Sequence, residues 1–419
     1  MKYIERSIED IVLRSDRTFK CVLVTGARQT GKSTMLKKLF PDRKYVSLDD
    51  PFIEEQAREQ PNMFMMLNQP PVIFDEIQRS PELFRYIKVK CDESDSKGLF
   101  CLSGSQALEL MEGISESLSG RVSVVELSGL SMREIQGSSF HEPFVPTMEY
   151  IEKRSGTAEP IDNIWEIIHR GSYPELQDKD VDWGAFFSSY IKTYIERDVR
   201  KLSAVHNLDD FRKFMVAVAA RTGQMLNYTN IADEIGKDQG TVRRWVSILE
   251  ASGIIYLLEP FTSSVLKRAI KSPKIYFRDT GLAAYLTRWL TPETLASGAM
   301  SGAFFETFVI SEILKSYANN GIDYRYCVFY YRGKDKKKMK SGGEEVTVES
   351  EIDLIIEENG VLYPIEIKKG TSVSADQTAA FTVLDKVPDK KRGMGAIVCL
   401  CPQPGALRDN ILQIPVWYI

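Results

Sequence analysis

The stretch from Lys20 to Phe40, KCVLVTGARQTGKSTMLKKLF, constrains the fold more than any other part of the sequence. A short apolar run leads directly into a glycine-containing turn, and a run with helical spacing follows that turn. Gly26, Gly31, Lys32 and Ser33 fill every fixed position of the pattern GxxxxGK[ST]. This order predicts a buried strand, a tightly curled loop and a helix, which together begin an α/β domain.

A loop of this kind binds phosphate for a physical reason. Its glycines let successive backbone N–H groups point inward, and the N-terminus of the following helix adds partial positive charge. Lys32 would then reach the β- and γ-phosphates of ATP, and the Ser33 hydroxyl would bind Mg²⁺. A chance glycine-rich turn is the alternative, which the flanking strand and helix disfavour. We assign to the nucleotide site Gly26, Ala27, Arg28, Gln29, Thr30, Gly31, Lys32, Ser33 and Thr34.

A second apolar strand, PVIFDEIQ, ends in Asp75 and Glu76. An acidic residue at the carboxyl end of a parallel strand lies beside the phosphate loop, where Asp75 would hold magnesium. Glu76 is then placed to polarise the attacking water as a general base. The two motifs together predict binding and hydrolysis of ATP with Mg²⁺ as the cofactor.

Two weaker signals concern Ser103 and Arg121. Ser103 ends the strand-like run LFCLSGS, where it is either a polar sensor of the γ-phosphate or part of an ordinary strand-end turn. Arg121 follows a helical run and precedes a strand, a place suited to an arginine finger. Such a finger would act within the chain or on a neighbouring copy. The alternative is a surface arginine at the end of a helix.

Length and composition set the broader frame. A chain of 419 residues predicts two or three domains, and its 43% hydrophobic and 27% charged residues are typical of globular proteins. The formal net charge of −4 argues against a wholly basic nucleic-acid coat protein. No CxxC pair, leader or membrane-length apolar run is present, which predicts a cytoplasmic protein with no membrane partner.

The pattern along the chain divides it into four regions. Alternating strands and helices predict a parallel-sheet domain over residues 1–160, and residues 161–222 are mainly helical. Residues 223–298 contain a helix-turn-helix with a strand-like wing, and residues 299–419 form a further α/β domain. Within the last region, the charged, glycine-containing residues 332–350 are expected to form a loop.

The helix-turn-helix candidate is the segment NYTNIADEIGKDQGTVRRWVSILEASGII. We predict a turn at Gly236, a second helix over Gln239–Ala251, and a cap on the first helix from Thr229 or Asn230. In the second helix the apolar face leaves polar residues for a DNA groove and its phosphates: Thr241, Arg243 and Arg244. The alternative is a module that packs domains together or binds protein.

The segment EIDLIIEENGVLYPIEIKKG predicts a β-hairpin with Asn359 and Gly360 at its turn. Asp353 lies on the first strand, and Glu366 and Lys368 share one face of the second. With Glu306 from the preceding helix, they resemble the PD-(D/E)xK nuclease constellation. There carboxylates such as Asp353 and Glu366 hold Mg²⁺, and a lysine such as Lys368 orients water for attack on a phosphodiester. A solvent-facing row of charges is the alternative.

The motifs GARQTGKST, VIFDEIQRSPELF, LSGS and SLSGRV, in this order, resemble the AAA-type P-loop ATPases of bacteria and archaea that carry a C-terminal DUF4143 region. The resemblance covers nearly the whole chain. It implies a P-loop NTPase parallel-sheet domain, a helical and winged-helix segment, and a C-terminal restriction-endonuclease-like α/β domain.

From these motifs we predict a Mg²⁺-dependent ATPase that couples ATP binding or hydrolysis to a DNA-contacting winged-helix and nuclease-like module. A nucleotide-operated switch that binds protein or DNA without cleavage is the alternative. DNA and a second copy of the chain are the candidate partners beside ATP.

Overall fold

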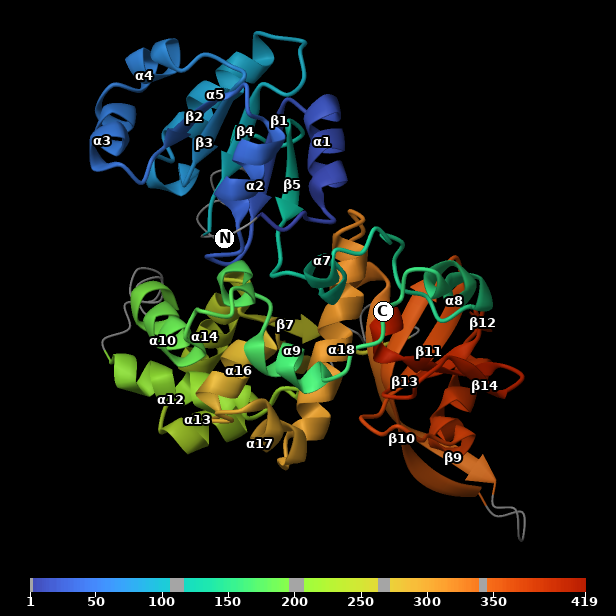
Figure 1. The fold of residues 1–419 in the computed structure, drawn as a ribbon. Coiled ribbons are helices and arrows are strands. Elements are labelled where there is room, and N and C mark those ends of the chain that lie inside the picture. The colour runs from blue at the N-terminus through green and yellow to red at the C-terminus, as the bar shows by residue number, and fades with distance from the viewer. Residues whose placement is uncertain (1–2, 106–116, 196–206, 263–271, 339–344) are drawn as a thin grey trace.

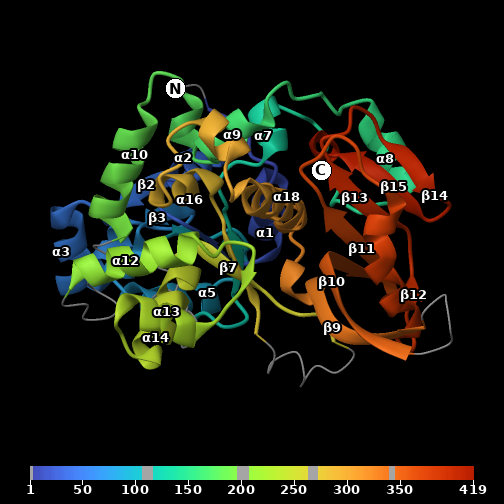
Figure 2. The same ribbon diagram turned by 90° about the horizontal axis from the view of Figure 1, so that it is seen from below.

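The computed structural model describes residues 3–105, 117–195, 207–262, 272–338 and 345–419. Figure 1 shows a parallel sheet with its helices at one end of the molecule, and Figure 2 shows a helical region and a second sheet side by side beneath it. The chain is therefore an α/β protein, as the sequence predicts.

The N-terminal sheet has the strand order β2-β3-β4-β1-β5, with every neighbouring pair parallel. Both faces of β1 are buried, with Cys21 and Leu23 on one side and Val22 and Val24 on the other. Helices α1 and α2 cover one face, and α3, α4 and α5 cover the other. The elements are α1 (Glu9–Thr18), β1 (Cys21–Thr25), α2 (Lys32–Leu39), β2 (Lys44–Ser47), α3 (Pro51–Glu59), α4 (Pro61–Leu67), β3 (Val72–Asp75), α5 (Leu83–Asp92), β4 (Phe100–Ser103) and β5 (Val122–Glu126).

A run of helices follows this sheet, as expected from the sequence. They are α7 (Met132–Gln136), α8 (Met148–Ser155), α9 (Ile164–Arg170), α10 (Trp183–Tyr190) with a π-helical continuation over Ile191–Ile195, and α12 (Leu208–Ala219). Further along the chain lie α16 (Thr280–Leu286), α17 (Pro292–Ser297) and α18 (Ser301–Ala318). None of the helices that the structure describes is long and apolar enough to cross a bilayer.

The helix-turn-helix is present, with α13 (Tyr228–Ile235) and α14 (Gln239–Ala251). The second helix has its predicted bounds, and Gly236 makes the turn with a φ of 67°. The predicted cap is wrong, because the Asn227 side chain accepts the Asn230 N–H. Strands β6 (Gln224–Met225), β7 (Ile255–Leu258) and β8 (Lys274–Phe277) form an antiparallel sheet in the order β6-β8-β7.

The C-terminal sheet follows α18. Three antiparallel strands, β9 (Val328–Lys338), β10 (Glu345–Glu358) and β11 (Val361–Ile367), precede a 3-10 helical segment over Ala375–Lys386. Strand β13 (Gly395–Cys399) then runs parallel to β11. The sheet is completed by β12 (Lys391–Arg392), β14 (Gly405–Arg408) and β15 (Ile411–Pro415).

The prediction of a loop over residues 332–350 is wrong for residues 332–338 and 345–350, while residues 339–344 lie outside the described ranges. Strands β9 and β10 extend through most of this segment and pair with each other, Arg332 lying opposite Glu351. The Arg332 guanidinium lies 3.5 Å from the Glu349 carboxylate and 4.0 Å from the Glu351 carboxylate. Opposite charges on neighbouring strands therefore stabilise the pairing of β9 with β10, although the charged composition of this segment had led us to predict a loop.

A continuous apolar core runs from Met132 to Ile419 and includes the helical region and part of the C-terminal sheet. Helix α8 lies within the expected first region, yet it packs on the last residues of the chain. Its Arg154 donates to the Trp417 carbonyl at 3.1 Å, and its Tyr150 hydroxyl donates to the Tyr418 carbonyl at 2.8 Å. The last strand of the P-loop sheet ends at Glu126, well before the boundary near residue 160 that we predicted between the first two regions.

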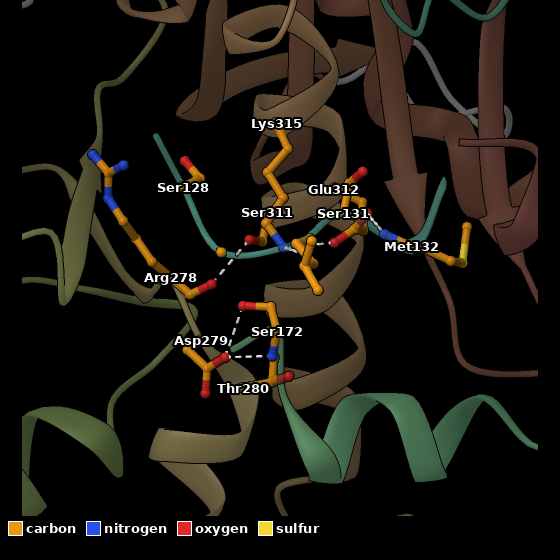
Figure 3. A network of polar contacts seen from close by, with 12 residues as sticks. Ser128, Ser131, Met132, Ser172, Arg278, Asp279, Thr280, Ser311, Glu312 and Lys315 are labelled. Carbon is orange, nitrogen blue, oxygen red and sulfur yellow. Dashed lines mark hydrogen bonds and ion pairs between the residues drawn. The ribbon is translucent and has the colours of Figure 1, made fainter. Parts of the chain in front are cut away.

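Residues 128–132, which we call the connector, join the N-terminal sheet to the rest of the molecule (Figure 3). The Glu312 carboxylate accepts the Met132 N–H at 2.7 Å, and the Lys315 ammonium donates to the Leu130 carbonyl at 2.8 Å. Both side chains come from α18, are buried, and form an ion pair of 2.8 Å with each other. The Leu130 N–H is satisfied by the Ser172 carbonyl at 2.7 Å. Helix α18 therefore holds the connector in place.

Replacing Glu312 tests this attachment. We expect Glu312→Ala to lower the free energy of unfolding by about 3–5 kcal/mol, because the buried Met132 N–H loses its acceptor and the buried Lys315 ammonium loses its carboxylate partner. Glu312→Gln keeps one acceptor oxygen and should cost less. Urea unfolding followed by tryptophan fluorescence measures both, with the exposed Glu152 of α8 replaced by Ala as the control. An unfolding midpoint that is unchanged in Glu312→Ala would contradict this account.

Candidate functional site

The loop between β1 and α2 is curled by left-handed backbone conformations. Gly26, Gln29 and Gly31 have φ values of 136°, 61° and 94°. A Cβ atom on Gly26 would lie 2.2 Å from the Leu127 carbonyl oxygen, so a larger residue does not fit there. The loop has the form that turns backbone N–H groups toward an anion at the start of α2.

Side-chain donors hold the carbonyl groups of this loop. The Lys32 ammonium donates to the carbonyls of Gly26 at 3.0 Å and Ala27 at 2.8 Å. The Arg6 guanidinium donates to the Thr30 carbonyl at 2.8 Å, a contact that the sequence analysis missed. Of the other residues assigned to the loop, Thr30 is buried, Arg28 and Gln29 are half-buried and Thr34 is exposed on α2.

Asp75 at the end of β3 gathers hydroxyl groups from three elements. Its Oδ1 accepts the hydroxyl of Ser33 at 2.8 Å and also that of Ser103, and its Oδ2 accepts the Tyr45 hydroxyl at 2.5 Å. Burial, together with the Asp75 carboxylate, raises the pKa of Tyr45, so that its hydroxyl remains a donor. The structure thus brings Ser33, Asp75 and Ser103 together beside the loop, and it adds Tyr45.

Glu76 follows Asp75 at the same edge of the sheet. Its backbone is left-handed with a φ of 55°, and its side chain is half-buried. The Glu76 carboxylate accepts from the Gln78 amide and from the Ser105 hydroxyl, the latter at 3.4 Å. These contacts place a carboxylate next to the hydroxyl and carboxylate oxygens around Asp75, a donor set that suits Mg²⁺.

Arg121 does not reach this site within the chain. Strand β5 runs parallel to β1, with Val122 opposite Cys21 and Glu126 opposite Thr25. Arg121 therefore lies at the amino edge of the sheet, whereas the loop leaves the carboxyl edge. Its guanidinium instead binds the Asp92 carboxylate, at 2.6 and 3.1 Å. The prediction that Arg121 is an arginine finger within its own chain is therefore wrong, because the direction of β5 places it at the opposite edge of the sheet. A role of Arg121 toward a neighbouring copy stays a prediction.

The helix-turn-helix region contacts the phosphate loop directly. A Cβ atom on Gly253, just beyond α14, would lie 3.3 Å from the Ala27 backbone nitrogen. The helical region also approaches the loop, since a Cβ atom on Gly31 would lie 4.0 Å from the Pro174 ring. The Arg278 guanidinium, which follows β8, forms an ion pair of 2.5 Å with Glu126 at the end of β5. The loop and the adjoining strand end are therefore packed against the region that carries α14.

The residues predicted to contact nucleic acid lie on α14. Arg243 and Arg244 are exposed, and the Arg243 guanidinium lies 4.2 Å from the centre of the Tyr228 ring. Thr241 differs from the expectation, because its hydroxyl donates to the Asp238 carboxylate at 2.6 Å and its N–H donates at 2.9 Å. Thr241 thus completes the N-terminal cap of α14, and the two arginines form the exposed basic part of the helix.

The predicted C-terminal hairpin brings Asp353, Glu366 and Lys368 together. The Lys368 ammonium lies 2.7 Å from the Glu366 carboxylate and 3.6 Å from that of Asp353. Burial, and next the negative charge of Asp353, raise the pKa of Glu366 to about 8. The same two causes raise the pKa of Glu306 on α18. We call Glu306, Glu351, Asp353 and Glu366 the carboxylate cluster.

A divalent cation fits the oxygen chemistry of this cluster but not its present arrangement. Across the described ranges, no group of three or more His, Cys, Asp or Glu side chains is arranged to hold a metal ion. At the carboxylate cluster, two ammonium groups lie against the carboxylates. Lys368 binds Glu366, and Lys274 from β8 binds Glu306 at 3.3 Å and Glu351 at 2.7 Å. Nothing in the motifs pointed to Lys274.

Comparison with known proteins gives three family matches along the chain. An AAA domain matches residues 18–136, and domains of unknown function match residues 161–293 (DUF8612) and 344–419 (DUF4143). Uncharacterized protein Rv2008c of Mycobacterium tuberculosis and Uncharacterized protein Mb2031c of Mycobacterium bovis are each 27% identical over 366 residues. Each alignment covers 87% of this chain and 74% of the relative.

Two solved structures are similar to parts of the chain at low identity. A Walker-type ATPase of Pyrococcus abyssi is 14% identical with a TM-score of 0.43, covering 68% of this chain and 96% of that protein. AMPPCP-bound DnaA from Aquifex aeolicus is 14% identical with a TM-score of 0.29, covering 58% and 85%. The family matches, together with the parallel sheet and its phosphate loop, show an AAA domain over residues 18–136 and a DUF4143 region over residues 344–419.

Proposed function

We propose that this protein binds ATP with Mg²⁺ and hydrolyses it. The observation that carries the proposal is the convergence of the Ser33 and Ser103 hydroxyls on the buried Asp75 carboxylate, directly beside the curled loop. Magnesium, when bound, would neutralise charge on the β- and γ-phosphates. Ser33 would hold it directly, and Asp75 would hold it through water.

The other residues of the loop would act on the nucleotide itself. The Lys32 ammonium now binds two loop carbonyls, and it would exchange these for oxygens of the β- and γ-phosphates. Glu76 would accept a proton from the attacking water, and its bonds to Gln78 and Ser105 would fix the direction of its carboxylate. Ser103 would sense the γ-phosphate through its hydrogen bond to the Asp75 carboxylate.

We further propose that the nucleotide state acts on DNA through the region that carries α14. The order α12, β6, α13, α14, β7, β8 is the order of a winged helix, and α14 presents Arg243 and Arg244 to solvent. Because Gly253 lies against Ala27, a movement of the phosphate loop would reach the end of α14. The nucleotide-induced change would therefore alter how α14 meets DNA.

A nuclease-like role of the C-terminal domain is the finer part of this proposal. The order of α18, three antiparallel strands, a helical segment and a parallel strand supports a PD-(D/E)xK-like core. Asp353 and Glu366 would be the metal ligands, and Lys368 would orient water. The second candidate is a switch that binds DNA or protein without cleavage, which the two ammonium groups in the carboxylate cluster favour. Incubation with supercoiled DNA, Mg²⁺ or Mn²⁺, and ATP separates the two functions.

A second copy of the chain is a further candidate partner. Arg121 and Asp92 are paired at the amino edge of the sheet, with side-chain exposures of 31% and 46%. In an oligomer that places this edge against a neighbour's phosphate loop, Arg121 would exchange Asp92 for a phosphate. Light scattering with and without ATP tests whether such an oligomer forms.

Two substitutions test the ATPase assignment. We expect Lys32→Ala to weaken ATP binding at least about tenfold, because a charge contact to phosphate is lost. Glu76→Gln should keep ATP binding but lower the hydrolysis rate by about 10²–10⁴-fold, since the general base is removed. Calorimetry and phosphate release measure the two effects, with the exposed Lys38 of α2 replaced by Ala as the control. Tight ATP binding by Lys32→Ala would contradict the phosphate assignment.

The DNA proposal predicts an electrostatic signature. Arg243→Ala and Arg244→Ala should each weaken DNA binding, and each lost phosphate contact should reduce the slope of log affinity against log salt by about one. Fluorescence anisotropy over a salt series measures both quantities. Lys153→Ala removes an exposed positive charge from α8 and should leave affinity and slope unchanged. Equal salt slopes for wild type and the two α14 variants would exclude this helix as the contact.

The raised pKa of Glu366 predicts a pH-dependent stability. Between its ordinary pKa and about 8, folded Glu366 holds a proton that the unfolded carboxylate lacks. The stabilisation is fully present below the unfolded pKa and is lost as pH rises through the folded pKa, at up to about 1.4 kcal/mol per pH unit. Stability of the wild type should therefore fall between pH 5 and 8 (roughly) more steeply than that of Glu366→Gln.

Thermal unfolding midpoints measured across this range compare the two proteins. Glu358→Gln is the matched control, because Glu358 is exposed on the neighbouring strand β10 and should keep the wild-type slope. Identical pH profiles for wild type and Glu366→Gln would show that Glu366 takes no part in the transition.

A further inference from the structure

Helices α3 and α4 carry a groove between them, at the side of the N-terminal sheet away from β5 (Figure 1). The groove has a volume of about 480 Å³, and its walls come only from the two helices and the residue that joins them. We call it the α3–α4 groove. It is lined chiefly by Phe52, Glu55, Glu59, Met63, Phe64 and Leu67.

Large apolar side chains lie exposed along this groove. The exposed fractions of Phe52, Met63 and Leu67 are 64%, 52% and 63%. Phe64 also lines the groove but is buried, and its ring centre lies 5.6 Å from that of Phe74 on β3. Scattered apolar residues are ordinary on a protein surface, whereas several around one hollow mark a place where another molecule binds. Because Phe64 packs on the sheet, the groove is formed before any partner arrives.

Two carboxylates accompany the apolar side chains. Glu55 and Glu59 are exposed, lie one turn apart on α3 and both line the groove. Neither forms an ion pair within the part of the chain that the structure describes, whereas the adjacent Glu54 is paired with Arg79 at 3.1 Å. Arg58, the cation of α3, does not line the groove. Like charges one turn apart repel each other, so a positively charged partner would relieve a cost that the free protein carries.

We propose that the α3–α4 groove binds a cationic amphipathic α-helix of a partner protein. Apolar side chains of that helix would cover Phe52, Met63 and Leu67. Lysine or arginine side chains beside them would bind Glu55 and Glu59. A helix suits the groove better than an extended peptide, because no strand lines the groove and an extended backbone would find no edge to pair with. The two carboxylates disfavour nucleic acid and anionic lipid, whose phosphates are also negative.

This inference does not rest on ATP hydrolysis, and its test uses the full chain without nucleotide. The probe is a fluorescein-labelled peptide of leucine and lysine in an amphipathic helical pattern, and fluorescence anisotropy measures its affinity. We expect Leu67→Ser to weaken binding about tenfold, because most of an apolar contact is lost. Glu55→Gln combined with Glu59→Gln should weaken binding about threefold or more at low salt and make the affinity less dependent on salt.

Matched variants outside the groove serve as controls. Leu290→Ser removes a leucine that is 68% exposed, and Glu149→Gln with Glu152→Gln removes two exposed carboxylates from α8. Both should bind the peptide as the wild type does. A peptide in which glutamate replaces lysine should bind at least about tenfold more weakly than the lysine peptide. If circular dichroism shows that Leu67→Ser is unfolded, Met63→Ser replaces it.

Three results would overturn the proposal. The first is equal affinity of the wild type and the folded groove variants for the lysine peptide, and the second is equal affinity of the wild type for the two peptides. The third is a wild-type dimer in sedimentation that Leu67→Ser dissociates, because a second copy of the chain would then occupy the groove. ATP binding by the same variants is measured separately and should be unchanged, so failure of the ATPase proposal is distinguishable.

Discussion

The structure depends on how the backbone of the connector, residues 128–132, is satisfied where it is buried. Arg6 donates to the Ser128 carbonyl at 2.7 Å, Lys315 donates to the Leu130 carbonyl at 2.8 Å, and Glu312 accepts the Met132 N–H at 2.7 Å. Buried peptide groups without hydrogen-bond partners lower the stability of the fold. The connector can therefore be buried here only because α18 and the N-terminal segment supply those partners. The same contacts set the position of the AAA domain relative to the rest of the molecule.

This attachment places the phosphate loop against a packed surface. Ala27 faces Gly253 beyond α14, and Glu126 is paired with Arg278 beyond β8. Close-packed interiors pass on small displacements because they contain little space to absorb them. A rearrangement of the loop around a triphosphate would therefore be felt in the helix-turn-helix region, which is the physical basis of the proposed coupling.

The two acidic sites show how neighbours decide what carboxylates can do. Asp75 is surrounded by hydroxyl groups, which leave its negative charge available to a cation at the phosphate loop. The carboxylate cluster instead has its negative charge opposed by the ammonium groups of Lys274 and Lys368. A fold therefore does not establish its usual chemistry, and here the origin of Lys274 in another region makes the cluster a meeting point of two parts of the chain.

The sequence by itself determined the local features: the strand, curled loop and helix from Cys21 to Leu39, the acidic end of β3, the bounds of α14 and the hairpin that joins Asp353 to Glu366. Each follows from residues close in the chain, through glycine conformation, apolar periodicity or strand alternation. Tertiary structure alone decided that Tyr45 binds Asp75, that Arg121 lies at the far edge of the sheet, and that Lys274 enters the carboxylate cluster. It also made residues 332–338 and 345–350 parts of β9 and β10, where the Arg332 guanidinium lies 3.5 Å from the Glu349 carboxylate of the neighbouring strand. These contacts depend on how segments distant in the sequence pack together, so the pattern within one segment cannot predict them.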